Sequence, residues 1–101
     1  MCLDGIRYTR KHLKKWMRPQ KRSVSIRFLG SDNTVIPQPL GVVDIVVPWN
    51  YPLSLCISPL ISAIAAGNRC MIKMAANSSV LSDLLHTLFA EKFPQEILTI
   101  V

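Results

Sequence analysis

The stretch from Pro39 to Asn50, PLGVVDIVVPWN, constrains the fold of this chain more than any other part of the sequence. Its middle is a run of β-branched apolar residues that one carboxylate interrupts, namely Val42, Val43, Asp44, Ile45, Val46 and Val47. This pattern is typical of a strand covered on both faces, and Pro48 ends it. Because ligands of open α/β sheets bind outside the carboxyl ends of the strands, Asn50 is a candidate site residue.

The composition indicates a small folded unit. The chain has 101 residues, of which 50% are hydrophobic and 18% are charged. This length allows one small domain or part of a larger one, and the composition excludes intrinsic disorder. Cys2, Cys56 and Cys70 lack the spacing of a metal site and indicate free thiols, so we expect a cytoplasmic location and no metal.

The net charge of +6 belongs to residues 1–22, which carry eight Lys or Arg residues and one carboxylate. Apolar residues at helical spacing predict a basic amphipathic helix there, ending by Arg18 before Pro19. We interpret it as a helix packed on its own domain with a solvated basic face. The alternatives are a helix that binds a membrane surface or nucleic acid, or a targeting peptide.

Residues 23–40 predict a β-hairpin. Ser23–Phe28 alternates polar and apolar residues, as a half-buried strand does. The turn residues Gly30–Asn33 then lead into a return strand over Thr34–Ile36. Pro37 lacks a backbone N–H group, so the return strand must end there or lie at a sheet edge.

The uncharged segment from Ile45 to Asn68 predicts a buried helix rather than a membrane span. It is long enough to cross a bilayer, but its three prolines and an amide would leave backbone groups unsatisfied in lipid. We predict a helix from Pro52 to Ala66. Gly67 and Asn68 end it, because both residue types accept left-handed backbone angles.

The remaining residues predict strand, helix and strand. Cys70–Met74 is a short apolar strand, and Ile97–Val101 begins another. The helix between them ends by Phe93, before Pro94, and carries one apolar stripe made of Val80, Leu81, Leu84, Leu85, Leu88 and Phe89. The order after Gly41 predicts an α/β fold with a parallel sheet. Such a sheet has apolar edges that two helices leave uncovered, so we expect a fragment of a larger domain.

Two motifs resemble the aldehyde dehydrogenase superfamily. PLGVVDIVVPWNYPL followed by SPLISAIAAGNRCMIKM is similar to the first part of its cofactor-binding domain, and QKRSVSIRF through VIPQPLGVV to its oligomerisation hairpin. Within the family, the wording resembles that of bacterial enzymes named for coniferyl aldehyde. The resemblance implies a partial Rossmann-like sheet in residues 41–101, preceded by the basic helix of residues 1–22 and the oligomerisation hairpin of residues 23–40.

The resemblance implies an enzyme that oxidises an aldehyde to a carboxylic acid with NAD or NADP. Asn50 matches the asparagine whose amide stabilises the oxyanion formed when a cysteine thiolate attacks the aldehyde. Lys73 matches the lysine that binds the adenosine ribose. The wall beside the nicotinamide is matched by Val46, Val47, Pro48 and Trp49. The structural alternatives are that Asn50 caps the next helix, Lys73 is a surface residue and Trp49 fills the core.

The nucleophile and the general base of the family have no match in this chain. Cys56 and Cys70 do not match the nucleophile position, and we expect both to be buried and inert. His12 and His86 have no partner that suggests a catalytic dyad and are expected to be ordinary helix residues. The isolated chain is therefore expected to be inactive.

Two residues depart from the family pattern. Ala76 stands where the family commonly has a glutamate that accepts hydrogen bonds from the ribose, which predicts a weaker preference for NAD over NADP. Asp44 places a charge in an apolar strand. Its carboxylate must reach solvent or find a partner, or else the position is under relaxed sequence constraint.

The partners follow from the same resemblance. It implies a homo-oligomer of the complete enzyme, a dimer or a tetramer, with an aldehyde substrate, no nucleic acid and no transmembrane segment. Two other interpretations stay open. One is a non-catalytic interaction module whose basic helix binds a membrane or nucleic acid in a salt-dependent way. The other is a disused gene remnant, which Ala76 and Asp44 suggest.

Overall fold

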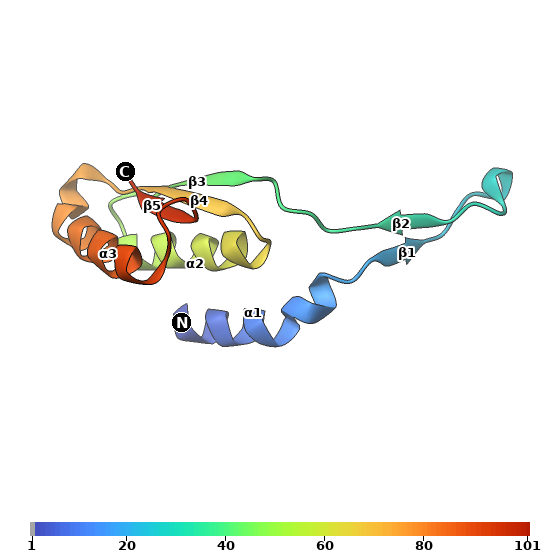
Figure 1. Ribbon diagram of the computed structural model, residues 1–101, viewed down its shortest axis with the longest axis horizontal. Helices are drawn as coiled ribbons and strands as arrows, with labels where there is room; N and C mark the ends of the chain where they lie inside the picture. The colour runs from blue at the N-terminus through green and yellow to red at the C-terminus, as the bar shows by residue number, and fades with distance from the viewer. Residues whose placement is uncertain (1) are drawn as a thin grey trace.

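The computed structural model describes residues 2–101 (Figure 1). Its helices and strands follow the order that the sequence predicts. The helices and strands are α1 (Cys2–Trp16), β1 (Gln20–Arg22), β2 (Asn33–Val35), β3 (Val42–Val46), α2 (Pro52–Ala65), β4 (Arg69–Lys73), α3 (Ser79–Lys92) and β5 (Leu98–Ile100). Two short 3-10 turns lie at Ile26–Phe28 and Ala76–Ser78. Within residues 2–101 no helix is long and apolar enough to cross a membrane.

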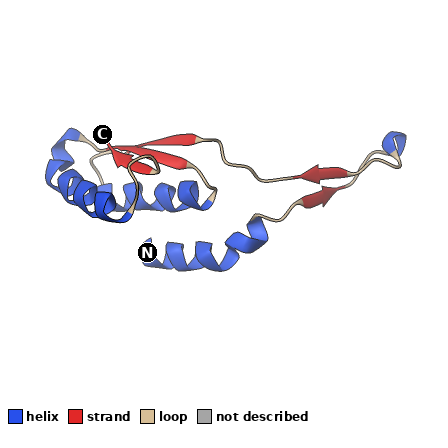
Figure 2. Cartoon of the chain, viewed as in Figure 1, coloured by secondary structure: helices blue, strands red, loops and turns tan. Residues whose placement is uncertain are grey.

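The three-stranded sheet is parallel, as predicted, with the order β3-β4-β5. β3 and β4 pair along their whole length, and Val46 lies opposite Lys73 at their C-terminal ends. α2 connects β3 to β4 and α3 connects β4 to β5, so the α/β alternation is confirmed (Figure 2). The carboxyl ends of the strands therefore share one edge of the sheet.

Both connecting helices pack on the same face of this sheet. The buried apolar side chains between them are Ile45, Val47, Cys56, Leu60, Ala63, Cys70, Ile72, Met74, Leu85, Leu98 and Ile100. The strand residues in this set alternate along each strand, so they project from one face. Ile72 lies on the central strand and is fully buried. Its truncation to alanine would cost about 2–5 kcal/mol of stability.

The opposite face of β3 carries Val42, Asp44 and Val46, and all three are exposed. The prediction that this strand is covered on both faces is therefore wrong for residues 2–101. The reason is that both helices connecting the parallel strands lie on the other face. Asp44 reaches solvent, which was one of the three outcomes expected for a charge in this strand.

The apolar stripe of α3 divides in the same way. Leu85 is buried, and Leu81 and Phe89 pack against the core. The other members of the stripe are exposed: Val80, Leu84 and Leu88. The predicted apolar stripe is therefore buried or packed on the core for half of its members only, because the core of the described chain reaches only one side of the helix.

The end of α2 is organised by Gly67 and Asn68. Gly67 has φ +84°, the left-handed angle expected after a helix. Asn68 acts through its buried side chain. Its amide donates to the Ala63 carbonyl oxygen at 3.1 Å, and its oxygen accepts from the backbone N–H groups of Leu40 at 2.6 Å and Gly41 at 3.0 Å. This tether joins the chain entering β3 to the end of α2.

The hairpin is present, but its first strand lies elsewhere than predicted. β1 spans Gln20–Arg22 and pairs antiparallel with β2 over Asn33–Val35. The predicted strand Ser23–Phe28 is wrong, because Ile26–Phe28 forms a 3-10 turn at the tip. Ile26 is 79% exposed and Phe28 is 65% exposed. Strand pairing ends where Arg22 lies opposite Asn33, so Ser23–Phe28 belongs to the tip at which the chain reverses direction, on an arm that projects away from the sheet (Figure 1).

α1 is an amphipathic helix that ends at Trp16, as predicted. It packs along α2, and a Cβ atom added at Gly5 would lie 3.6 Å from Ile61 Cδ1. Its Lys and Arg side chains are exposed. This agrees with the interpretation of a helix packed on its own domain with a solvated basic face.

Candidate active-site edge of the sheet

The candidate site lies where β3 and β4 end side by side. Val46 pairs with Lys73, and the Val47 N–H group donates a hydrogen bond of 2.8 Å to the Lys73 carbonyl oxygen. The chain then bends at Trp49 and Asn50 before α2 begins. The structure therefore brings Lys73 to the same sheet edge as the loop that carries Asn50, although 23 positions separate them in the sequence.

The turn into α2 is held in an unusual backbone conformation at Tyr51. This residue has φ 48° and ψ 47°, in the left-handed region that residues other than glycine rarely adopt. Such a conformation costs on the order of 1–3 kcal/mol. Pro48 ends the strand before it, and Pro52 opens the helix after it, the first-turn position that proline favours. The loop thus has three constrained residues around Asn50.

Asn50 is exposed, and within residues 2–101 its side chain makes no hydrogen bond. The N-cap position of α2 is held by Tyr51, without a side-chain capping hydrogen bond. The structure therefore gives no support to the alternative in which Asn50 caps the helix. Its catalytic role stays a prediction, and its amide is unengaged and faces solvent.

The residues predicted to line the cofactor differ in exposure. Val46, Pro48, Trp49 and Lys73 are exposed, and Trp49 is 71% exposed. The alternative in which Trp49 fills the core is therefore wrong for the described chain. Val47 is buried in the core, and its backbone N–H group bonds to Lys73. Ala76 lies exposed in the 3-10 turn that follows β4.

Two of the three thiols lie inside the core. Cys56 and Cys70 are buried. Burial raises the pKa of both thiols, and the nearby Cys2 raises the pKa of Cys56 further. A thiol with a raised pKa is protonated at neutral pH and reacts slowly.

The histidines lie on helices away from the sheet edge. His12 Nδ1 lies 2.8 Å from the Tyr8 carbonyl oxygen, and its ring forms a cluster with the rings of Tyr8 and Trp16. His86 is exposed on α3. Within residues 2–101 no three His, Cys, Asp or Glu side chains are grouped so that they could hold a metal ion.

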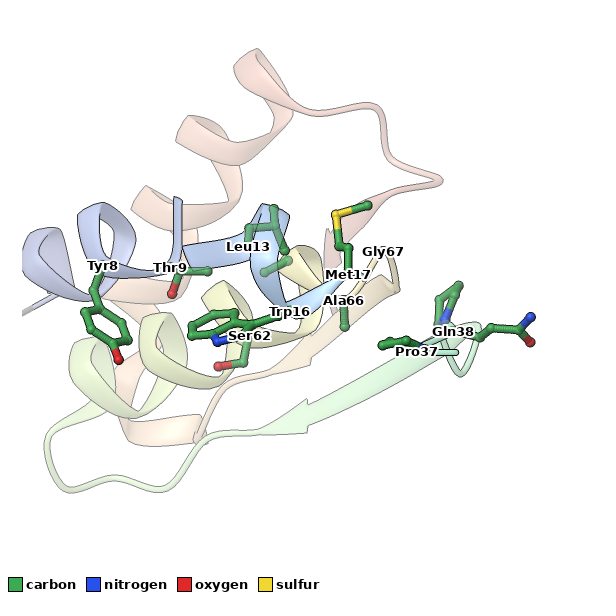
Figure 3. Close-up of a pocket in the computed structure, with 12 residues that line it drawn as sticks. Tyr8, Thr9, Leu13, Trp16, Met17, Pro37, Gln38, Ser62, Ala66 and Gly67 are labelled. Carbon is green, nitrogen blue, oxygen red and sulfur yellow. The ribbon is translucent and has the colours of Figure 1, made fainter. Parts of the chain in front are cut away.

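A cavity of about 670 Å³ lies away from the candidate site, between α1, the segment after β2 and the end of α2 (Figure 3). Figure 3 shows Tyr8 and Gln38 at opposite ends of the lining, with Trp16 and Ser62 between them. None of the predicted site residues lines it. It borders Gly67, near the start of β4, whereas Asn50 follows the C-terminal end of β3. The prediction for Asn50 therefore does not depend on this cavity.

The family model described as the aldehyde dehydrogenase family matches residues 1–101. The chain belongs to the aldehyde dehydrogenase family. It is 48% identical over 99 residues to a probable coniferyl aldehyde dehydrogenase from Pseudomonas aeruginosa, covering 98% of this chain and 21% of that relative. It is 41% identical over 97 residues to a probable coniferyl aldehyde dehydrogenase from Caulobacter vibrioides, covering 93% and 20%. The expected resemblance is confirmed.

The aldehyde dehydrogenase fold is confirmed by a solved structure. The substrate-bound state of Staphylococcus aureus AldH superposes with a TM-score of 0.94 at 30% identity, covering 99% of this chain and 22% of that enzyme. The chain spans about a fifth of the length of the curated relatives that it matches. The activity and partners of those longer enzymes are therefore proposals for this chain.

Proposed function

We propose that this chain forms the oxyanion-binding edge and part of the dinucleotide site of an aldehyde dehydrogenase that oxidises an aldehyde to a carboxylic acid with NAD or NADP. One observation carries the proposal. The exposed, unengaged amide of Asn50 follows β3 at the sheet edge where Lys73 ends β4. This edge is where open α/β sheets bind ligands.

In this function Asn50 acts on the charge that develops in the transition state. Attack of a thiolate on an aldehyde carbon forms a carbon–sulfur bond and moves the carbonyl electron pair onto oxygen. The Asn50 amide donates a hydrogen bond to that oxygen. Its resting state supports the role, because a donor without a partner breaks no protein hydrogen bond when the oxyanion forms.

The residues present fit a dinucleotide at this edge. The Lys73 ammonium group is exposed and binds oxygen atoms as a compact charge with three donors. Val46 and Trp49 are exposed apolar residues at the end of β3 and offer a wall for a flat ring. These residues would hold the nicotinamide half of the dinucleotide, which would supply the hydride acceptor for the oxidation. Ala76 presents no carboxylate near Lys73.

The nucleophile must come from outside these elements. Cys56 and Cys70 are buried, and their thiols are protonated at neutral pH for the reason given above. The proposed function therefore needs the nucleophile and the general base of a complete aldehyde dehydrogenase. In that enzyme the hairpin arm mediates a homo-oligomer, which the exposed Ile26 and Phe28 at its tip support.

A chimera tests the role of Asn50. Residues 1–101 replace the matched 99 residues of the Pseudomonas aeruginosa relative, and the NAD(P)H formed from an aldehyde is followed. Replacing Asn50→Ala removes one oxyanion donor, so we expect kcat to fall by about 10²–10³ with little change in KM. Asn33→Ala, in the hairpin, is the matched control and should leave kcat unchanged. A kcat for Asn50→Ala equal to that of the control would refute the role.

A further inference from the structure

We propose that the outer side of α1 binds the surface of a membrane that contains anionic phospholipids. The binding surface is a basic face made of the exposed cations of α1 and the one that follows it, namely Arg7, Arg10, Lys11, Lys14, Lys15 and Arg18. Attachment to a membrane surface goes beyond the proposed catalytic function and does not depend on it.

The basic face is the side of α1 that does not pack on the fold. The half-buried residues of the helix share the other side, as helical spacing requires, and they are Cys2, Gly5, Thr9, His12 and Leu13. Every Lys and Arg side chain of α1 is exposed. Figure 1 shows α1 on the far side of α2 from the sheet, so the basic face lies on the outside of the described chain.

The cations of the basic face have few partners in the described chain. Arg7 lies 3.8 Å from a carboxylate oxygen of Asp4, whereas Arg10, Lys11, Lys14 and Lys15 form no ion pair within residues 2–101. Several of these cations are instead four residues apart, and like charges at that spacing destabilise a helix slightly. An anionic partner would replace this repulsion with attraction.

The helix dipole explains only part of this arrangement. Lys14 and Lys15 lie in the last turn of α1, where cations interact favourably with the C-terminal end of a helix. That effect is confined to the last turn, so it does not account for Arg7, Arg10 and Lys11. Residues 1–22 carry eight Lys or Arg residues and one carboxylate, a net charge of +7, and the whole chain carries +6. The positive potential is therefore concentrated at α1 and orients this side towards an anionic surface.

Exposed apolar residues beside the basic face favour a membrane over a nucleic acid. Leu3 is 67% exposed, Ile6 is 45% exposed and Met17 is 62% exposed. Helical spacing places them in one row, since the Met17 N–H group still bonds to the Leu13 oxygen at 3.0 Å. Cations beside such a row are typical of a helix that lies between lipid headgroups and acyl chains. The phosphates of a nucleic acid would contact the cations but leave the apolar row in water.

Vesicle sedimentation tests the proposal. The 101-residue chain should bind vesicles of phosphatidylcholine mixed with phosphatidylglycerol, should not bind phosphatidylcholine alone, and should bind less as salt increases. Each cation near an anionic membrane surface contributes about fivefold in affinity, so Lys11→Gln combined with Lys14→Gln should weaken binding at least about tenfold. The matched control is Arg69→Gln combined with Lys92→Gln. It removes the same charge from exposed positions outside α1 and should leave binding nearly unchanged.

A second variant tests the apolar row. Leu3→Ser combined with Met17→Ser keeps every charge and should lower vesicle affinity at least about threefold, because less apolar surface enters the interface. Circular dichroism checks that each variant folds. The absence of binding to the mixed vesicles, or an equal loss in the control, would overturn the proposal. Tighter binding to double-stranded DNA than to these vesicles at the same phosphate concentration would also overturn it, in favour of a nucleic acid.

Discussion

At the scale of single residues, the condition for an oxyanion donor is that its N–H groups are free before the reaction. Asn50 meets this condition within residues 2–101, while the other structurally important asparagine, Asn68, does not. Asn68 is buried and uses both ends of its amide on backbone groups. The two asparagines therefore differ in exposure and in hydrogen bonding: Asn68 is a structural tether, and Asn50 is available as a donor.

The residue at position 76 gives a test of cofactor preference. Ala76→Glu in the chimera places a carboxylate in the turn after Lys73. It would repel a 2′-phosphate and accept hydrogen bonds from a free ribose. We expect the ratio of kcat/KM for NAD over that for NADP to rise by about tenfold or more. The matched control Ala76→Gln keeps the length without the charge, and an equal rise with Gln would contradict the electrostatic explanation.

The tether of Asn68 gives a test of stability. Asn68→Ala leaves the backbone N–H groups of Leu40 and Gly41 and the Ala63 oxygen without this partner. Leu40 is 90% exposed, and the Ala63 oxygen also accepts from the Asn68 backbone N–H group, so water and the backbone replace part of what is lost. At about 0.5–1.5 kcal/mol for each net hydrogen bond, we expect a loss of about 1–3 kcal/mol in the free energy of unfolding. Urea unfolding measures it. Asn77→Ala, at an exposed position, should change the value by less than about 0.5 kcal/mol.

At the scale of elements, the prediction was accurate where residues within or next to an element in the sequence determine where it begins and ends. Pro52 and Gly67 mark the two ends of α2, and the structure places that helix within one residue of the prediction. The left-handed angle at Tyr51 had no local signal, because the residue is neither glycine nor asparagine. The first hairpin strand failed for a different reason. Alternation indicates which side chains share a face, but it does not locate the turn, and here Ile26–Phe28 lies in the turn at the tip of the arm.

The hairpin tip gives a test at this scale. Phe28→Asp in the chimera replaces an exposed apolar side chain at the end of the arm with a charge. If the arm mediates a homo-oligomer, burying this charge in the contact is unfavourable, and light scattering should show a shift towards monomer. Ser23→Asp adds the same charge lower on the arm and should leave the mass unchanged. An oligomer unaffected by Phe28→Asp would place the contact elsewhere.

At the scale of the whole molecule, the dimensions are 59 × 26 × 24 Å and the radius of gyration is 17.8 Å. A compact domain of this length has a radius of gyration of about 13 Å. The projecting arm accounts for the elongated shape (Figure 1). The sequence showed that the sheet needed more cover than two helices offer. The sequence did not show which face of the sheet would be uncovered, because that depends on α2 and α3 both lying on the same face.

Catalytic activity can also be tested on the whole chain. The purified 101-residue chain should produce no NAD(P)H from an aldehyde, because Cys56 and Cys70 are buried thiols with raised pKa values. Spectrophotometry at 340 nm measures this directly. Aldehyde-dependent NAD(P)H formation by the chain alone, retained in a Cys56→Ala, Cys70→Ala variant, would show that another nucleophile had been missed.

The tether at Asn68 has a mechanical meaning for a molecule with a long arm. Its three hydrogen bonds hold the chain just before β3, between the arm on one side and the strand that leads to Asn50 on the other. β3 spans about 17 Å at the usual rise per residue. Force applied at the arm tip meets this anchor before it reaches β3. The anchor is therefore a clamp between the arm and the strand that leads to Asn50.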